Sequence, residues 1–183
     1  YVHCFLDGRD TPPASGENFV IDLENKMKEK GVGKIASISG RFYAMDRDKR
    51  WDRVETAYKI IAQNENLQTI TPVQYMENSY QKEIFDEFVE PASFIDFGGI
   101  KKDDGIIFIN FRNDRARQIC TALANDDFTE FNRQTYCKNL ITMTSYDDKF
   151  NFPIMFKNDD IKDTLADVIA KNGLRQLHTA ETE

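Results

Sequence analysis

Residues 1–40 read YVHCFLDGRDTPPASGENFVIDLENKMKEKGVGKIASISG, and they carry the signals of a strand, a helix and a second strand in that order. Tyr1–Leu6 is rich in strand-forming residues and runs into a turn-forming DGRDTPP sequence. Apolar residues recur at helical spacing over Ser15–Lys30, and Gly31 is a typical residue to end a helix. Residues 34–39 have the pattern of the second strand. Because parallel strands need a crossover, and helices are the usual one, this order favours an α/β fold with a largely parallel sheet.

The same alternation continues along the chain. Gly105–Asn110 is apolar without alternation, which is typical of a central strand covered on both faces. The other expected elements are a helix from about Asp46 with Trp51, Val54, Tyr58 and Ile61 buried, a helix from Thr71-Pro72 to about Lys82, an extended segment over Phe88–Ile95, a helix opened by Phe111–Arg115, a strand at Leu140–Thr144, a helix capped by Asp159 or Asp160, and a strand at Leu174–Thr179. We therefore predict an α/β protein with a mostly parallel sheet flanked by helices.

Composition limits the class of protein. With 183 residues, 40% of them hydrophobic and 30% charged, the chain is long enough for one globular domain and is not of a disordered type. No apolar run approaches the roughly 20 residues of a membrane helix, so we expect a soluble, cytoplasmic protein. The net charge of -7 repels nucleic acids and anionic membranes. The three cysteines, without a CxxC pair, favour a reducing compartment and argue against a structural metal site.

Arginines follow three of the expected strands. They are Arg9, Arg41 with Arg47 shortly beyond it, and Arg112 with Arg115. In open α/β sheets ligands bind beyond the carboxyl ends of the strands, and guanidinium groups match the oxygens of carboxylates and phosphates. In an acidic chain, such a placement predicts a site for a small polyanion.

Each of these residues also has a simpler interpretation. Taken one at a time, the arginines are suited to ion pairs with nearby acids such as Asp7 and Asp114. Asp10, held among guanidinium groups, is a candidate to exchange a proton with a substrate hydroxyl. Its simpler role is to cap the following helix or to fix the turn, and the residues alone favour the cap. Asp46 and Asp48 form a DxD pair that resembles a metal motif, although a helix cap is the commoner role of such a pair.

Four stretches of the chain resemble the cofactor-independent, or 2,3-bisphosphoglycerate-independent, phosphoglycerate mutases. The matching stretches are His3–Pro13 (HCFLDGRDTPP), Ser39–Glu55 (SGRFYAMDRDKRWDRVE), Asn110–Gln118 (NFRNDRARQ) and Gly173–Leu177 (GLRQL) followed by Ala180–Glu183 (AETE). They occur in the same order as in that family and cover essentially the whole chain. Phe42 and Asn113 depart from the residues that relatives often have, Tyr and Pro respectively.

The resemblance implies a domain organisation. The family enzymes have a domain similar to alkaline phosphatase, with two manganese ions and a serine nucleophile, and a second α/β domain inserted into it. Residues 1–158 would be the inserted, substrate-binding domain, shortened at its N-terminus, and residues 159–183 would return into the phosphatase-like domain. The metal ligands and the nucleophile would then lie outside this sequence, so no metal-binding residue is expected in it.

The resemblance also implies a function. The family interconverts 3-phosphoglycerate and 2-phosphoglycerate in glycolysis through a phosphoserine intermediate, and needs both domains. The positions that match its substrate-binding residues are Arg9, Asp10, Arg41, Arg47, Arg112 and Arg115, with Asp10 as the catalytic acid or base. The residues alone leave two alternatives: a stand-alone module that binds a phosphorylated metabolite without chemistry, and a metal-dependent phosphotransferase that uses Asp46 and Asp48.

Overall fold

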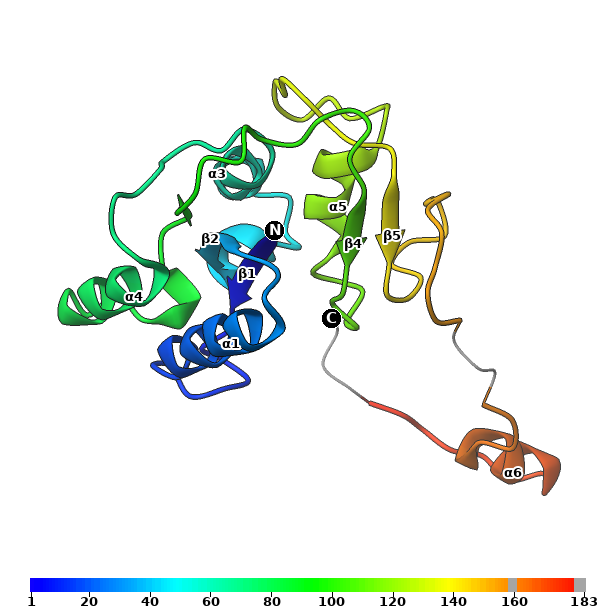
Figure 1. Ribbon diagram of the computed structural model, residues 1–183. Coiled ribbons are helices and arrows are strands. Elements are labelled where there is room, and N and C mark those ends of the chain that lie inside the picture. The colour runs from blue at the N-terminus through cyan, green and yellow to red at the C-terminus, as the bar shows by residue number, and fades with distance from the viewer. Residues whose placement is uncertain (158–160, 180–183) are drawn as a thin grey trace.

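The computed structural model describes residues 1–157 and 161–179 and has an α/β architecture (Figure 1). Along the chain its elements are β1 (Val2–Leu6), α1 (Gly16–Lys30), β2 (Ile35–Gly40), α2 (Arg41–Ala44), α3 (Trp51–Ala62), α4 (Pro72–Gln81), the 3-10 helix η1 (Asp86–Phe88), β3 (Ala92–Ser93), β4 (Ile106–Phe108), α5 (Arg117–Ala124), β5 (Leu140–Thr142) and α6 (Leu165–Lys171). The α/β prediction is confirmed.

The strands form two sheets. In the first, β1 and β2 run parallel with Leu6 opposite Gly40, and β3 adds a short antiparallel edge with Ser93 opposite Ser37. In the second, β4 and β5 run parallel with Ile106 opposite Leu140. The prediction of mostly parallel pairing is therefore correct. The described strands do not join into one continuous sheet, because β1 and β4 face each other without a hydrogen-bonded ladder between them.

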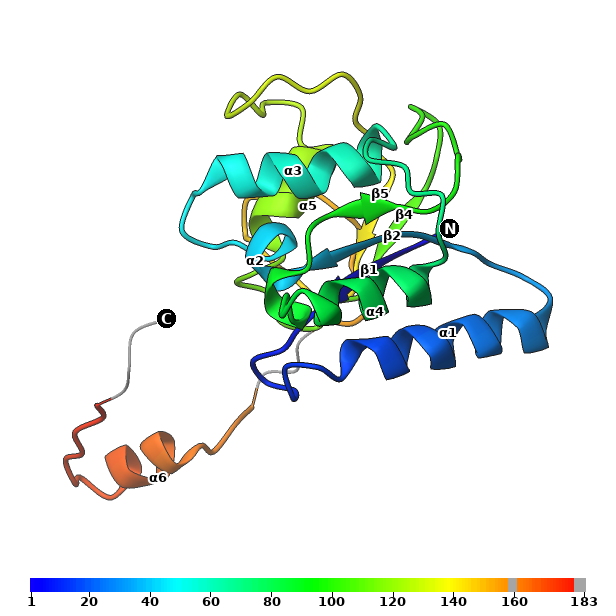
Figure 2. The same ribbon diagram turned by 90° about the vertical axis from the view of Figure 1, so that its left-hand side faces the viewer.

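Helices cover the strands from two sides. Figure 2 shows α3 and α5 on one side of the strands and α1 and α4 on the other. One hydrophobic core joins α3 and α5 to β4 and β5, with Tyr58, Ile119 and Leu140 buried in it. A second core, with Val20, Ile38 and Met76, lies between α1, α4 and the first sheet. The buried strand β2 thus lies between two layers of helices, as parallel strands usually do.

Two helices agree closely with their sequence signals. Helix α1 ends at Gly31, whose φ of 66° is the left-handed conformation that glycine adopts at little cost. Helix α4 begins with a capping box, in which Thr71 accepts a hydrogen bond from the Gln74 backbone N–H and the Gln74 side chain binds the Thr71 N–H. Both ends were predicted from local residue chemistry alone.

The helix expected from Asp46 begins later, at Trp51. The Asp46 carboxylate accepts hydrogen bonds from the backbone N–H groups of Asp48 and Arg50, at 2.9 and 3.0 Å. Lys49 between them has a φ of 60°, which is incompatible with a right-handed helix. A local turn therefore replaces the first helical turn, and a short helix, α2, precedes it.

Three other boundaries differ from prediction. Residues 111–115 do not open a helix, because α5 begins only at Arg117 after a turn. The last helix begins at Leu165, where Thr164 forms a capping box with Asp167; Asp159 and Asp160 lie outside the described residues. Residues 174–179 have no strand partner among the residues that the structure describes, so the strand expected there is not formed.

Residues 105–110 were predicted to form a central strand covered on both faces, and the prediction that both faces are covered was wrong. The strand is restricted to β4, where Phe108 is buried but Ile107 is 63% exposed, and Ile109 just beyond it is 68% exposed. One face of β4 packs towards α5, whereas the other borders an open cavity. In the part of the chain that is described, no helix is long and apolar enough to cross a membrane.

Candidate functional site

The site begins where β2 ends. Gly40 is the last residue of β2, and Arg41 is the first residue of α2, so the guanidinium group lies at the carboxyl ends of the two parallel strands. Arg41 is 5% exposed. Its Nη1 hydrogen bonds to the carboxylate of Asp7, which follows β1, and to Asp10 Oδ2 at 3.1 Å. Burial alone would lower the pKa of Arg41, but these two carboxylates outweigh it and raise that pKa, so the residue stays charged.

A second ion-pair group stands beside the first. Arg47 Nη1 lies 2.7 Å from Asp114 Oδ2, and Arg112 Nε lies 2.9 Å from Asp114 Oδ1. One carboxylate therefore bridges two guanidinium groups that come from distant parts of the chain. Partial burial would raise the pKa of Asp114, but the hydrogen bonds from Arg47 and Arg112 outweigh it and hold that pKa below its ordinary value.

Arg115 completes the cluster. Its Nη1 donates to the Met45 carbonyl oxygen at 3.0 Å, whereas its Nε is buried without a hydrogen-bond partner among the described residues. Burial lowers the pKa of Arg115, and the neighbouring charges of Arg41, Arg47 and Arg112 lower it further, against the opposing effect of Asp114. Four of the predicted arginines are therefore within electrostatic reach of one point, and at Arg115 the positive charges outweigh the negative one.

Arg9 does not join this cluster. Its side chain is 61% exposed and its nearest described acid is Glu87, with Nη1 3.7 Å from Oε1. The turn places Arg9 on the surface, because the Asp7 carboxylate accepts hydrogen bonds from the backbone N–H groups of Arg9 and Asp10 at 3.2 and 3.3 Å. Arg9 thus lies on the same loop as Asp7 and Asp10, but its ion pair is with Glu87.

Asp10 lies at the edge of the cluster. Its side chain is 70% exposed, and among the described residues its carboxylate pairs with Arg41. It does not cap α1: the carboxylate that binds the first N–H groups of that helix belongs to Asp86. The capping interpretation of Asp10 was therefore wrong, and the carboxylate is accessible to a bound molecule.

Asp46, one of the two residues of the DxD pair, is committed to structural contacts. Besides the two backbone N–H groups of its turn, its Oδ2 accepts from Gln118 Nε2 at 3.1 Å. Over residues 1–157 and 161–179, no group of three or more His, Cys, Asp and Glu side chains is placed to hold a metal ion. His3 donates to or accepts from Ser37 Oγ at 2.8 Å, and burial lowers its pKa to about 4, which keeps the ring neutral at pH 7.

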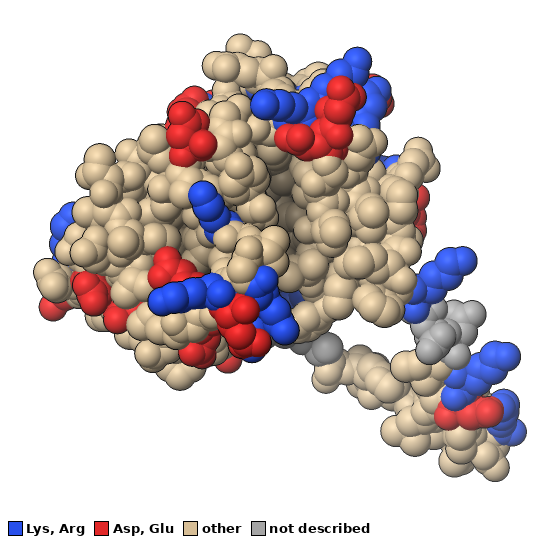
Figure 3. Space-filling model, viewed as in Figure 1, with Lys and Arg blue, Asp and Glu red and all other residues tan. Residues whose placement is uncertain are grey.

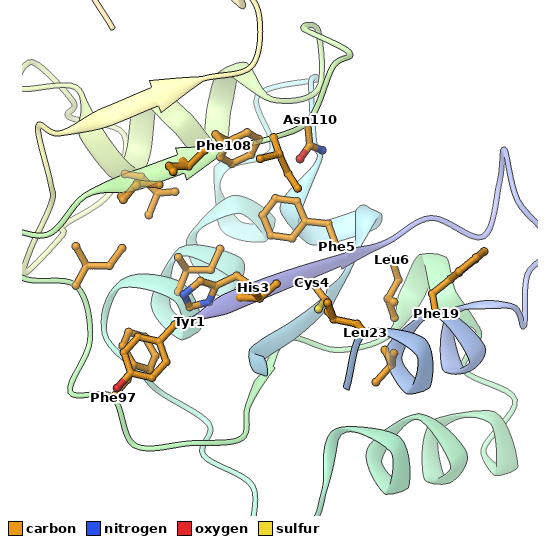
Figure 4. A pocket seen from close by; sticks show the side chains of 18 of the residues that line it. Tyr1, His3, Cys4, Phe5, Leu6, Phe19, Leu23, Phe97, Phe108 and Asn110 are labelled. Atoms are coloured by element: carbon orange, nitrogen blue, oxygen red, sulfur yellow. The ribbon is translucent and has the colours of Figure 1, made fainter. Parts of the chain in front are cut away.

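An apolar cavity of about 1040 Å³ lies beside the arginine cluster, between β1 and β4. Figure 4 shows Phe5 and Phe108 between the two strands and Leu23 and Phe19 on the side of α1. The two phenylalanine rings are 5.8 Å apart. In Figure 3 the hollow on this face is bordered mostly by uncharged side chains, and charged side chains gather above and below it.

The sequence could not reveal the residues that organise this site. Asp114 appeared only as one of several possible ion-pair partners, and the buried Asp86 carried no local signal at all. Asp86 lies 70 residues from Gly16, whose N–H it binds, and no spacing rule connects the two positions. Asp7 was detectable from its turn-forming DGRD sequence, although the sequence did not assign it to Arg41.

Several arginines thus lie beyond the strand ends of an α/β domain, the region where ligands bind in folds of this kind. A sequence model described as "BPG-independent PGAM N-terminus" matches residues 1–148. The chain therefore belongs to the family of 2,3-bisphosphoglycerate-independent phosphoglycerate mutases, as its motifs indicated.

Individual relatives agree with this assignment. The chain is 49% identical to a 2,3-bisphosphoglycerate-independent phosphoglycerate mutase of Helicobacter hepaticus and 47% identical to one of Campylobacter jejuni, in each case over all of this chain but 37% of the relative. It also resembles a crystal structure of Leishmania mexicana phosphoglycerate mutase at low cobalt concentration, with a TM-score of 0.79 and 25% identity over 94% of this chain and 34% of the other. The chain thus spans little more than a third of the length of these relatives.

Proposed function

We propose that this chain is the substrate-binding part of a 2,3-bisphosphoglycerate-independent phosphoglycerate mutase, and that the arginine cluster holds 3-phosphoglycerate and 2-phosphoglycerate. The observation that carries the proposal is the convergence of Arg41, Arg47, Arg112 and Arg115. Like charges brought together in a partly buried site are unfavourable by themselves, and an anion relieves that cost. Phosphoglycerate carries both a phosphate and a carboxylate, which suits a site of several guanidinium groups.

The residues would divide the work of holding the substrate. Arg115 has a buried N–H that points to no described acceptor, so a substrate oxygen is a natural partner for it. Arg47 and Arg112 share Asp114, and a phosphate or carboxylate oxygen would add to that pair. Arg9 is 61% exposed and stands apart from these arginines, so in this proposal its side chain would turn from Glu87 towards the cluster to contact a bound anion.

Asp10 is proposed as the acid or base of the reaction. In an isomerisation through a phosphoserine, the ester oxygen that loses the phosphoryl group gains a proton, and the hydroxyl that later receives the phosphoryl group loses one. A single carboxyl group that donates the first proton and accepts the second returns to its starting state. Asp10 is exposed and its carboxylate hydrogen bonds to Arg41, so it is available for this exchange.

The proposed domain boundary is at residues 158–159. The family match ends at residue 148, and both hydrophobic cores lie before the boundary. Beyond it, Ile161, Leu165 and Leu174 are largely exposed, and α6 has no buried residue. We propose that residues 159–183 pack against the remainder of the longer enzyme, the phosphatase-like part.

The metals of the proposed enzyme, two Mn²⁺ ions in the family, do not fit the described residues. Asp46 is already occupied by hydrogen bonds, and no cluster of suitable ligands occurs over the described ranges. We therefore assign the ions and the nucleophilic serine to the rest of the enzyme, and derive no step of the reaction through them from this chain. A phosphotransferase centred on Asp46 and Asp48 is not favoured by this geometry.

Calorimetric titration of 3-phosphoglycerate tests the binding role directly. The protein is compared with an Arg112→Gln, Arg115→Gln double variant at low ionic strength, where screening is weak. Arg50→Gln is the matched control. Arg50 likewise forms ion pairs with acidic residues, Asp46 and Asp48, but it lies outside the arginine cluster. We expect the double variant to lose at least about tenfold in affinity, since each charged hydrogen bond contributes on the order of 1.5–3 kcal/mol.

Two results would contradict the proposal. If Arg50→Gln weakened binding as much as the double variant, the effect would be one of overall charge and not of the cluster. If the longer enzyme carrying Arg112→Gln and Arg115→Gln kept its KM and kcat, the cluster would not be the substrate site. A longer enzyme that binds phosphoglycerate but never interconverts the two isomers would support a binding module without catalysis.

A further inference from the structure

A buried carboxylate that forms no ion pair with the described residues lies beside the site. Asp86, the first residue of η1, is 1% exposed. Its Oδ2 accepts hydrogen bonds from the backbone N–H groups of Ser15 and Gly16, at 3.1 and 2.8 Å. Its Oδ1 accepts from the Tyr80 hydroxyl. Every one of these donors comes from another segment of the chain.

The contacts of Asp86 complete the start of α1. That helix has Ser15 as its N-cap, but the Ser15 side chain makes no capping hydrogen bond and binds the Pro12 carbonyl oxygen. Asp86 supplies the missing acceptor from 70 residues away, and its own N–H donates to the Pro13 carbonyl oxygen at 2.9 Å. The C-terminal end of the loop of residues 7–15 is thus tied to η1 by three hydrogen bonds, two to the Asp86 carboxylate and one from the Asp86 backbone N–H.

The other end of the same loop is held by close packing. A Cβ atom on Gly8 would lie 2.8 Å from the Glu87 nitrogen and 2.9 Å from the Asp86 Cβ, so only glycine fits against η1 there. Gly8 also has a φ of 73°, which other residues rarely adopt. The loop that carries Asp7, Arg9 and Asp10 therefore rests on η1 at both of its ends.

The same 3-10 turn also supports Arg41. A Cβ on Gly40 would lie 2.3 Å from the Glu87 carbonyl oxygen, and the Gly40 N–H donates to the Val89 carbonyl oxygen at 2.8 Å. Gly40 immediately precedes Arg41. One short segment, 86–89, thus contacts both backbones whose side chains meet in the Arg41, Asp7 and Asp10 group.

We propose that Asp86 is a positioning residue of this site, which holds the loop of residues 7–15 against η1 so that Asp7 and Asp10 meet Arg41. It touches no substrate in this role. The inference rests on the proposed function of the arginine cluster, and it adds a residue outside the four stretches that resemble the family. Tyr80 supports the arrangement, because burial and the Asp86 carboxylate both raise the pKa of its hydroxyl and keep it a donor.

The test uses the longer enzyme with Asp86→Ala, Asp86→Asn and a matched control. Asp86→Ala leaves the Ser15 and Gly16 N–H groups without their acceptor, whereas asparagine keeps one acceptor oxygen of the same reach. Thr71→Ala is the control, because it removes the N-cap of α4 at an exposed position away from η1. All variants are compared by melting temperature, kcat, KM and amide hydrogen exchange.

We expect Asp86→Ala to lower kcat/KM by about 10- to 100-fold, because misplacing a catalytic group by about 1 Å has an effect of this size. Amide exchange of residues 8–16 should accelerate while that of β4 and β5 stays unchanged. Asp86→Asn should restore most of the activity. Thr71→Ala should lower the melting temperature but leave kcat and KM as they are.

Two outcomes would overturn the inference. In the first outcome, Asp86→Ala has normal kcat and KM while the Arg112→Gln, Arg115→Gln variant is impaired. The arginine cluster would then be the substrate site, and Asp86 would not position it. In the second outcome, Asp86→Ala and Thr71→Ala both lose activity to the extent that each lowers the melting temperature. Asp86 would then have only a general structural role. If Arg112→Gln, Arg115→Gln itself had normal kinetics, the proposed function would fail first and independently.

Discussion

At the scale of single residues, the arginines of the site differ in how far carboxylates balance their charge. Arg41 is buried and paired with two carboxylates, whereas Arg115 is partly buried among other arginines and has a buried N–H without a described partner. Removing the first exposes Asp7 and Asp10 to each other. Removing the second relieves repulsion. Substituting Arg41 should therefore lower both stability and substrate binding, whereas substituting Arg115 should lower binding with little effect on stability.

We predict that Arg115→Met changes the free energy of unfolding by less than about 1 kcal/mol, because lost repulsion offsets the lost hydrogen bond to Met45. Arg41→Ala should lower that free energy by about 2 kcal/mol, since it leaves two carboxylates facing each other without their common partner. Both variants should lose affinity for 3-phosphoglycerate. Urea denaturation and calorimetry provide the two measurements, and a strongly destabilised Arg115→Met would contradict this account.

A pH dependence follows from Asp114. Its pKa is below the ordinary value of 3.8 in the folded chain, because the hydrogen bonds from Arg47 and Arg112 outweigh the effect of burial. A lowered folded-state pKa contributes stability above the unfolded-state pKa, and the contribution is lost as the pH falls through the folded-state pKa. We predict that Asp114→Asn is less stable than the parent by about 1–3 kcal/mol at pH 7.

The difference between parent and Asp114→Asn should shrink below about pH 4, where the carboxylate of the unfolded chain becomes protonated. Urea denaturation at a series of pH values measures it. A difference that stayed constant from pH 7 down to pH 3 would show that the charge of Asp114 contributes nothing to folding.

At the scale of elements, β2, η1 and α2 meet at Gly40. A side chain on Gly40 would overlap the backbone of η1, with a Cβ 2.3 Å from the Glu87 oxygen. Backbone atoms cannot rotate out of the way as a side-chain end does. The junction therefore depends on glycine at this position for steric reasons, and not because of an unusual φ angle.

Gly40→Ala should lower the free energy of unfolding by about 1–3 kcal/mol and displace Arg41, since overpacking in a tight contact has this cost. Gly105→Ala is the matched control, because a Cβ there would meet nothing within 4 Å. Thermal melting and 3-phosphoglycerate titration of both variants check the prediction. Equal behaviour of the two glycines would show that η1 moves aside easily.

At the scale of the whole molecule, the two sheets leave an apolar cavity between β1 and β4. Ile107 and Ile109 are mostly exposed beside it, although they come from a strongly apolar sequence. Exposed apolar surface of this kind binds hydrophobic dyes. The arginine cluster lies beyond the carboxyl ends of the strands, outside this apolar lining.

We predict that the chain binds the dye ANS in its folded state, and that Ile107→Gln with Ile109→Gln reduces the fluorescence clearly. The free energy of unfolding should change by less than about 0.5 kcal/mol, because both side chains are mostly exposed already. Val32→Gln is the control, since Val32 is equally exposed but does not line the cavity. Dye fluorescence unchanged by the double substitution would place the bound dye elsewhere.

The sequence by itself determined the α/β class, the strand-helix-strand order of residues 1–40, and the helix ends at Gly31 and Thr71. These features depend on residues close together in the chain, through side-chain periodicity, turn chemistry and capping. It also located the arginines behind their strands, because the end of a parallel strand is recognisable from local pattern alone.

Only the tertiary structure decided which of these residues meet. Arg47 and Arg112 reach the same Asp114, Asp86 caps a helix 70 residues away, and Arg9 stays apart from the cluster. The start of α3 likewise depended on the hydrogen bonds of Asp46 in its turn. Contacts between distant segments depend on how the helices and sheets pack, and spacing along a single chain contains no rule for them.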